Sequence, residues 1–217
     1  MSIFKFSDIA PKPRWVPKTP RGAVRMVATK FLAKKGWLDS ALAQRPIDAA
    51  GGPLPSHTYA LISFLEPRLN KDLSVFEYGS GNSTLWYSER VGRVVSVEYE
   101  ESFVEETSIR APSNVEYRHR EPNGPQYWGC VLEGGSKYDI VVVDGIHRYE
   151  CAIAARAGLT DRGVVIVDNT DSKRHGRAVK PLLKAGFRRL DFRSMGPIWS
   201  VEWTTSIFYK PDNCLGI

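Results

Sequence analysis

The segment from Val75 to Thr84, VFEYGSGNST, constrains the fold of this chain more than any other. Apolar residues lead to an acid, a glycine-rich turn follows, and polar residues suited to capping then begin a helical pattern. In open α/β sheets this strand, turn and helix form a ligand-binding junction at the carboxyl ends of the strands. Gly79 and Gly81 allow a sharp turn and a close approach of the backbone to a ligand. The segment therefore predicts a nucleotide-type site in a parallel sheet.

Two acids narrow the choice of ligand. Glu77 precedes the glycine turn, and Glu98 ends the next β-branched run, 21 positions later. An acid about 20 residues past the turn is placed to accept the ribose hydroxyls of a nucleoside. A carboxylate beside the turn repels a pyrophosphate and attracts ammonium or sulfonium groups. Because S-adenosylmethionine carries both of these positive groups, the acids favour it over a dinucleotide.

Strand and helix patterns alternate along most of the chain, which predicts right-handed crossovers and a parallel sheet. The last two strand patterns have no helix between them and are expected to pair as an antiparallel hairpin. We predict a Rossmann-like α/β fold: a seven-stranded, mostly parallel sheet with one antiparallel strand in a C-terminal hairpin and helices on both faces. The expected strands are residues 74–78, 93–98, 115–119, 138–144, 164–168, 187–192 and 204–210.

Charge divides the chain into two parts. Residues 1–50 carry ten Lys or Arg and three Asp or Glu, whereas the remaining 167 residues carry 20 and 21. We therefore predict a basic N-terminal helical extension, residues 1–52, ahead of a cofactor-binding domain, residues 53–217.

Within this extension, Arg21 to Trp37 is predicted to be helical, with four apolar residues on one face: Val24, Val27, Phe31 and Leu32. Such a helix either docks on the domain with its basic face solvated, or contacts an anionic membrane surface or an acidic partner.

Three scattered cysteines without a CxxC pair indicate reduced thiols, and there is neither a long uncharged apolar run nor a signal-peptide pattern. We expect a cytoplasmic protein, with peripheral membrane contact through the extension as an option.

A second basic run, from Lys173 to Arg193, lacks the aromatic residues of an RNA-binding motif, so a nucleic-acid partner is not favoured.

The segments Glu77-Tyr-Gly-Ser-Gly81 and Val97-Glu98 resemble the two cofactor motifs of the class I S-adenosylmethionine-dependent methyltransferases, across about residues 56–210. The resemblance implies that the glycines back the methionine part of the cofactor, that Glu98 holds the ribose, and that residues after the third strand lie near the adenine. The cofactor-binding residues expected on this basis are Glu77, Tyr78, Gly79, Ser80, Gly81, Ser83, Glu98, His119 and Arg120.

Two further acidic strand ends suggest where a reaction would occur. Asp144 follows the apolar run IVVV, and Asp168-Asn169 follows VVIV, so all three side chains are expected at one edge of the sheet. Their oxygen atoms are ligands that Mg²⁺ accepts. The arrangement resembles the catechol and caffeoyl-coenzyme A O-methyltransferases, which bind a divalent ion with an Asp and an Asp-Asn pair. Asp144, Asp168 and Asn169 are thus the predicted metal ligands.

His147 lies three residues after Asp144, where the catechol enzymes have a lysine base, and we predict His147 and Asp144 as catalytic residues. The glycine turn departs from the catechol pattern and is closer to that of bacterial methyltransferases with an Asp-Gly-x-His/Arg motif after the fourth strand. The alternatives are that Asp168 and Asn169 only cap a turn and that His147 only begins a helix. Without a metal, Asp144 or His147 could orient the acceptor.

The leading functional hypothesis is methyl transfer from S-adenosylmethionine to an oxygen of a small molecule or glycan-type acceptor, with assistance by Mg²⁺ as an option. Tryptophans in the segment from Met195 to Trp203, together with Tyr127 and Trp128, could wall the acceptor site or simply pack their own loops. The alternative functions are a nicotinamide-dependent oxidoreductase and a non-catalytic nucleoside-binding adaptor that uses the basic extension.

Overall fold

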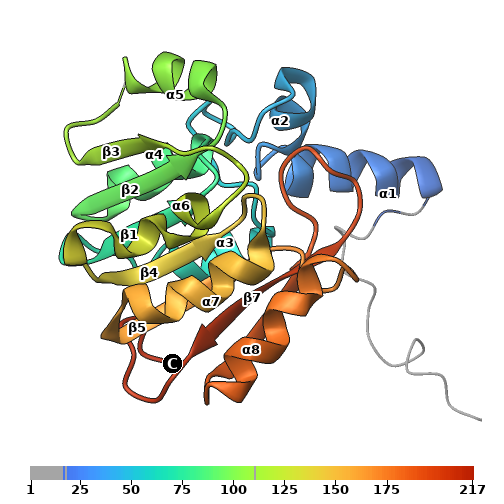
Figure 1. Cartoon of the computed structure of the whole chain (residues 1–217). Helices are drawn as coiled ribbons and strands as arrows, with labels where there is room; N and C mark the ends of the chain where they lie inside the picture. Colours follow the sequence, from blue (N-terminus) through green and yellow to red (C-terminus); the bar gives the residue numbers. More distant parts are fainter. Residues whose placement is uncertain (1–16, 18, 110) are drawn as a thin grey trace, which may run out of the picture.

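A seven-stranded sheet forms the centre of the structure, a computed structural model that describes residues 17, 19–109 and 111–217 (Figure 1). The strands lie in the order β3-β2-β1-β4-β5-β7-β6. All neighbours pair in parallel except β7, which is antiparallel to both β5 and β6. The predicted fold class is confirmed, and β7 is the reversed strand. The bounds are β1 Ser74–Tyr78, β2 Arg93–Glu98, β3 Val115–His119, β4 Tyr138–Val143, β5 Leu159–Val167, β6 Arg188–Ser194 and β7 Trp203–Tyr209.

Strand β4 shows why an uninterrupted apolar run forms a central strand. Its side chains alternate between the two faces of the sheet, and helices cover both faces. Val141 and Val143 pack into one core cluster, whereas Ile140 and Val142 pack into the other, and none of the four has exposed surface. The run ends at Asp144, the first residue past the strand.

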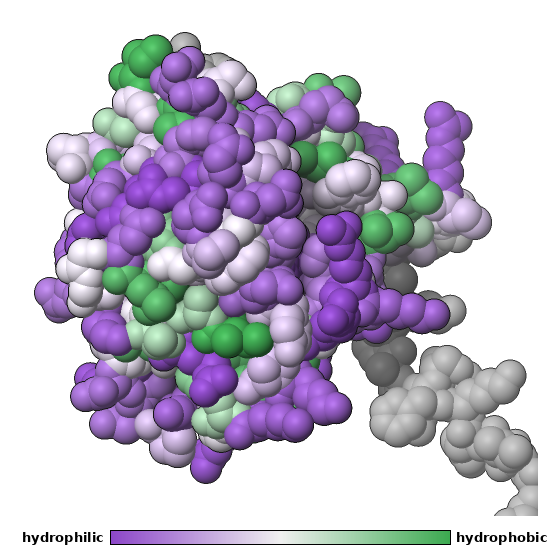
Figure 2. Space-filling model, in the orientation of Figure 1, coloured by the Kyte–Doolittle hydropathy of each residue, from purple (hydrophilic) through white to green (hydrophobic). Residues whose placement is uncertain are grey.

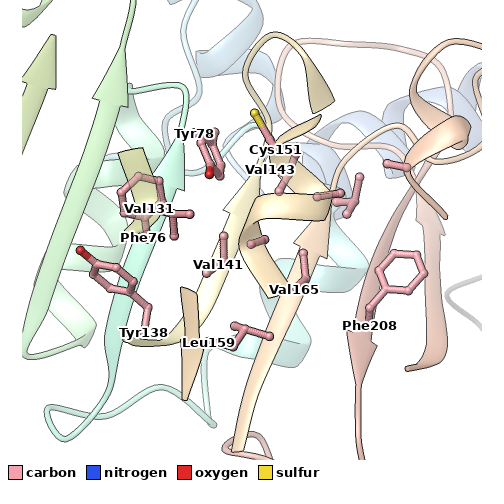
Figure 3. Packing of buried hydrophobic residues seen from close by; sticks show 14 of the residues in the cluster. Phe76, Tyr78, Val131, Tyr138, Val141, Val143, Cys151, Leu159, Val165 and Phe208 are labelled. Atoms are coloured by element: carbon pink, nitrogen blue, oxygen red, sulfur yellow. The ribbon is translucent and has the colours of Figure 1, made fainter. Parts of the chain in front are cut away.

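Helices cover both faces of the sheet. The first cluster packs the sheet against α6, η3, α7 and α8 (Figure 3), and the second packs it against α3 and α4. The bounds are α3 Tyr59–Leu65, α4 Asn82–Arg90, α5 Glu101–Ser108, α6 Pro125–Trp128, η3 Gly129–Gly135, α7 Arg148–Gly158, η4 His175–Ala178 and α8 Val179–Lys184. Helix α5 contacts β2 and β3 near one edge of the sheet.

The N-terminal helical region is less regular than the sequence suggests. The predicted helix over 21–37 is instead α1 (Pro20–Met26) continuing as the π-helical segment η2 (Val27–Leu32), followed by a turn and then α2 (Trp37–Ala43). The turn ends at Gly36, whose φ is 70°, and a Cβ there would lie 2.4 Å from the carbonyl carbon of Asp48. The prediction was wrong there because close packing against a later loop, which local periodicity does not show, ends the helix.

The extension and the sheet domain meet through a short loop. Ile47 pairs with Pro53 in an isolated β-bridge, and the side-chain amide of Asn82 donates to the carbonyl oxygen of Pro46 over 2.5 Å. The division at residue 52 stays a prediction, and residues 1–16 and Lys18 of the predicted extension lie outside the described residues. In the part of the chain that is described, no helix combines the length and apolar character needed to span a bilayer.

Candidate functional site

A cavity of about 750 Å³ lies at the carboxyl ends of β1, β2 and β4. This volume is in the range of small-molecule sites. The predicted residues Gly79, Ser80, Gly81, Ser83, Glu98 and Asp144 line it. The structure therefore brings the two sequence motifs, 19 residues apart at Gly79 and Glu98, to one cavity.

The two glycines of the turn have different roles. Gly79 has a φ of +92°, and a Cβ there would lie 3.0 Å from the Cα of Gly145, so this residue allows the ends of β1 and β4 to pack together. Gly81 has an extended backbone, and a Cβ there would have only the Ser83 Oγ within 4 Å, at 3.9 Å. Because Gly81 lines the cavity, its missing side chain leaves space for a ligand rather than relieving strain.

The backbone N–H groups of the glycine turn are already engaged by the protein. Gly79 donates to the carbonyl of Val97 over 2.9 Å, Ser80 donates to Glu98 Oε2 over 2.9 Å, and Gly81 donates to Thr84 Oγ1 over 3.1 Å. Dinucleotide-binding proteins use such donors and the following helix N-terminus to bind a pyrophosphate. Here these three donors are not available for that purpose.

Glu98 holds the site together and faces the ligand space. It accepts hydrogen bonds from the backbone N–H groups of Ser80, Tyr99 (2.7 Å) and Glu100 (3.3 Å), and its side chain lines the cavity. A carboxylate has about four acceptor positions, so Glu98 keeps capacity on Oε2 for a ligand hydroxyl. The carboxyl group is thus positioned by the turn that it helps to shape.

Glu77 lies beneath the glycine turn, not in the cavity wall. Its side chain has no exposed surface and accepts hydrogen bonds from the hydroxyls of Thr84 (2.6 Å) and Ser96 (3.4 Å). Its Oε1 is buried without a partner among the described residues. Burial raises the pKa of Glu77 to about 7. The expectation that Glu77 faces the ligand as a carboxylate therefore needs correction, since the carboxyl group is buried beneath the turn and burial favours its protonated form.

Three predicted cofactor residues lie away from the cavity. Tyr78 points into the core and donates its hydroxyl to the carbonyl of Trp128 over 2.5 Å. His119 Nε2 lies 3.1 Å from the Tyr99 carbonyl, and Arg120 forms an ion pair with Glu133. Tyr78, His119 and Arg120 are not among the residues that line the cavity, and their placement near the cofactor stays a prediction.

The cavity has two groups of lining residues that sequence reasoning missed. Tyr99, Phe103 and Tyr117 form an aromatic wall from the end of β2, helix α5 and strand β3. Residues 44–46 reach the cavity from the N-terminal extension. A tyrosine directly after Glu98 was a usable signal for the first group. Nothing in the sequence pattern indicated the second, because it depends on how the loop after α2 folds back.

Arg148, at the start of α7, occupies the centre of the predicted metal site. Its guanidinium donates to Asn169 Oδ1 over 2.8 Å and forms an ion pair of 2.8 Å with Asp144 Oδ1; the nearest Asp168 carboxylate oxygen is 3.9 Å away. It also donates to the backbone carbonyls of Asp144, Gly145 and Asp168. A guanidinium cation already satisfies the oxygens proposed as ligands, so these residues do not fit a bound Mg²⁺.

The contacts and burial of Asp168 also argue against a bound metal ion. Asp168 Oδ1 accepts hydrogen bonds from Trp203 Nε1 at 3.0 Å and from the Thr205 hydroxyl, and the side chain is buried. Burial raises the pKa of Asp168 to about 6. No cluster of three or more His, Cys, Asp or Glu suited to a metal is found over residues 17, 19–109 and 111–217. The strand-end acids form a polar network around Arg148 rather than a metal centre.

A second cavity of about 420 Å³ adjoins the first. Both are lined by Ser56 and Asp144, and the second is completed by Asp168, Asn169, Trp199, Val201 and Trp203. Asp144 therefore stands at the boundary between two spaces, and burial raises its pKa while the ion pair with Arg148 opposes that effect. Of the aromatic residues considered for an acceptor site, Trp199 in the terminal loop and Trp203 at the start of β7 line this cavity, whereas Tyr127 is fully buried in the core.

His147 lies outside both cavity walls. It precedes α7 in a left-handed conformation with a φ of 50°, and its ring packs against Trp128, with centroids 5.6 Å apart, and against Tyr127. His147 begins a helix, as in the alternative, and lines neither cavity, so its role as a base stays a prediction that this placement does not favour. Asp144 is the only one of the two predicted catalytic residues that the structure places at a cavity.

Comparisons with known proteins support the fold. No family model and no curated protein matches the chain. Among solved structures, a precorrin-6y C5,15-methyltransferase from Geobacter metallireducens GS-15 is similar with a TM-score of 0.55 and 17% identity, over 70% of this chain and 87% of that one. A precorrin 8W decarboxylase from Methanobacterium thermoautotrophicum gives 0.53 and 19%, over 77% and 97%.

A further similar structure contains a ligand. A protein from Streptococcus mutans, described as a candidate methyltransferase and solved in complex with SAH, has a TM-score of 0.51 and 12% identity, over 72% of this chain and 100% of that one. At these identities the likeness establishes architecture. The chain has the Rossmann-like fold that these solved structures share.

Proposed function

We propose that this chain is an S-adenosylmethionine-dependent methyltransferase that methylates a hydroxyl of a small molecule or glycan-type acceptor. The observation that carries the proposal is the arrangement of Glu98 and the glycine turn on one cavity, with the turn's N–H groups directed to protein acceptors instead of a phosphate. An acid that faces the cavity beside a turn whose N–H groups are already engaged suits a nucleoside with a positively charged tail.

Different lining residues would contact different parts of the cofactor. The Oε2 atom of Glu98 would accept a hydrogen bond from a ribose hydroxyl, and the wall of Tyr99, Phe103 and Tyr117 would pack against the nucleobase. Gly81 leaves room for the remainder of the ligand beside the turn. When bound, S-adenosylmethionine supplies an electrophilic methyl group and leaves as S-adenosylhomocysteine.

Asp144 is the group proposed to contact the acceptor, because its side chain lines both cavities. It accepts the proton that the acceptor hydroxyl loses as the new bond to carbon forms. Arg148 is a positioning residue that holds Asp144 in place through its ion pair. The tryptophans at 199 and 203 provide an apolar wall for the acceptor, which is consistent with a ring-bearing molecule or sugar.

Calorimetry tests the cofactor assignment. We expect S-adenosylmethionine and S-adenosylhomocysteine to bind the wild type, and Glu98→Ala to weaken both by about 100-fold through the loss of charged hydrogen bonds. Gly81→Leu should abolish binding, because the leucine side chain would occupy the cavity. Glu89→Ala, at an exposed position of α4, is the matched control. Absence of binding by the wild type, or unchanged affinity in both cavity variants, contradicts the proposal.

A transfer assay tests the role of Asp144. With labelled methyl donor and a library of hydroxylated small molecules and glycans, Asp144→Asn should lower transfer by about 10²- to 10⁴-fold while cofactor affinity changes little. Full transfer activity in Asp144→Asn would remove this residue from the reaction. If the protein binds the cofactor but methylates no compound of the library, the adaptor hypothesis is favoured instead. The oxidoreductase hypothesis predicts binding of reduced nicotinamide cofactor, which we do not expect here.

A further inference from the structure

The projecting N-terminal helix carries an apolar stripe that no part of the described chain covers. Val24, Val27 and Phe31 are 70%, 46% and 55% exposed. Their spacing of three and four residues puts them on one face of the continuous helix formed by α1 and η2. Ala23 and Met26, elsewhere on this helix, are partly buried. The stripe therefore does not dock this helix on its own domain, which was one sequence-based expectation.

Basic residues flank this stripe on both sides. Within α1 and η2, Arg21 and Arg25 fall on one side of the stripe and Lys30 on the other, and the exposed Lys34 follows in the turn. Between Thr19 and Leu38 the sequence has five Lys or Arg and no acid. Figure 2 shows hydrophobic and hydrophilic side chains intermixed on this projecting part of the surface. An apolar stripe with basic residues on both sides is the pattern of a helix that lies in the plane of a lipid interface.

A second apolar element lies next to the helical region. Trp199 and Val201, in the loop between β6 and β7, are 61% and 62% exposed. The loop is tied to the start of α2 by a hydrogen bond of 3.0 Å from Trp37 Nε1 to the Trp199 carbonyl. Tryptophan is favoured at lipid interfaces because its ring is apolar and its N–H is polar. Exposed apolar groups on two separate elements fit a broad surface better than a groove made for a single helix.

We propose that α1 and η2 bind the surface of an anionic lipid bilayer, with the stripe of Val24, Val27 and Phe31 inserted at the headgroup level. Attraction between Arg21, Arg25 and Lys30 and anionic lipids supports the apolar insertion. Contact with a second copy through this face would bring the two basic sets together and is opposed by their repulsion. A nucleic acid would be met by the basic residues, but would leave the apolar stripe without a partner. The stripe of Val24, Val27 and Phe31 lines neither cavity, whereas Trp199 and Val201 also line the second cavity.

Vesicle co-sedimentation of the full chain tests the proposal. Binding is expected to vesicles that mix phosphatidylcholine with anionic phosphatidylglycerol, and to be weak with phosphatidylcholine alone. Phe31→Asp should lower the partition coefficient by at least about tenfold, because it places a charge in the inserted stripe. Ile109→Asp, at an 85% exposed apolar position after α5, is the matched control and should bind like the wild type. Circular dichroism and calorimetry with the cofactor show that each variant is folded.

A charge-reversal pair separates a directed surface from general basicity. Arg21→Glu with Lys30→Glu should abolish binding, whereas Lys180→Glu with Lys184→Glu, in the basic patch at α8, should not. Failure of the wild type to bind anionic vesicles overturns the proposal, as does equal loss in both charge-reversal pairs. Retained binding by Phe31→Asp overturns insertion of the stripe. A concentration-dependent dimer that disappears in Phe31→Asp would assign the face to self-association and also overturn it.

Discussion

Replacing Glu77 with Gln tests the account of the buried acid beneath the glycine turn. Burial raises the pKa of this carboxyl group from its ordinary 4.5 to about 7. The folded protein therefore binds a proton on Glu77 more tightly than the unfolded chain does. The stability that this proton contributes is fully present below about pH 4.5 and is lost as pH rises through about 7. A Gln side chain has no such proton to lose.

The size of the effect follows from the pKa change. Each tenfold change in proton affinity is worth about 1.4 kcal/mol, so the rise from 4.5 to about 7 corresponds to about 3 kcal/mol. We expect the free energy of unfolding of Glu77→Gln, relative to the wild type, to increase by about this amount between pH 4 and pH 8. Any constant effect of the new amide cancels from this pH-dependent difference.

Urea denaturation across this pH range, without cofactor, measures the difference. Other titrating groups act in both proteins and cancel: His57, for example, is fully buried and has a pKa lowered to about 4 by burial, which gives the opposite pH trend. Glu89→Gln, an exposed change on α4, is the control and should give a flat difference. A flat difference for Glu77→Gln would refute the inference that an ionised Glu77 is costly in the folded state.

Three further predictions concern the same region. A positively charged cofactor favours the ionised form of Glu77, so we expect its affinity to rise from pH 6 to pH 8 with release of protons; calorimetry in buffers of different ionisation enthalpy measures this, and proton uptake would contradict it. Arg148→Ala leaves Asp144 and several carbonyls without their donor and should destabilise the fold by about 3–5 kcal/mol at pH 8 in urea denaturation, whereas a loss below about 1 kcal/mol would show that the network is dispensable. Because Arg148 occupies the predicted metal position, a chelator or added Mg²⁺ should change neither the melting temperature nor cofactor affinity, and a clear dependence on either would restore the metal hypothesis.

The sequence predicted the sheet well because strand burial leaves a direct pattern. Continuous apolar runs such as those of β4 and the second half of β5 are required where both faces are covered, and the glycine turn and Glu98 follow from the geometry of two neighbouring strand ends. The predicted boundaries of β1, β2 and β3 agree with the structure. The reversed strand was predicted from a different signal: the last two strand patterns have no helix between them and were therefore expected to pair as an antiparallel hairpin.

The details of the site could not be predicted in the same way, because they depend on which neighbouring group forms a hydrogen bond or ion pair with each polar side chain. Asp144 and Asn169 have the chemistry of metal ligands, but Arg148 folds back from the start of α7 to fill the space between them. Glu77 was expected to face the ligand, yet strand alternation and Thr84 direct it beneath the turn. His147 is directed toward the aromatic residues of α6 by its own left-handed backbone. Side-chain direction and long-range contacts decide each case.

The most direct test of the central claim is a crystal structure of the full chain grown with S-adenosylhomocysteine. The account predicts the ligand in the cavity at the ends of β1 and β2, with its ribose hydroxyls at Glu98, its base against the wall of Tyr99, Phe103 and Tyr117, and Arg148 still paired with Asp144. A ligand bound elsewhere, or ribose hydroxyls turned away from Glu98, would contradict it.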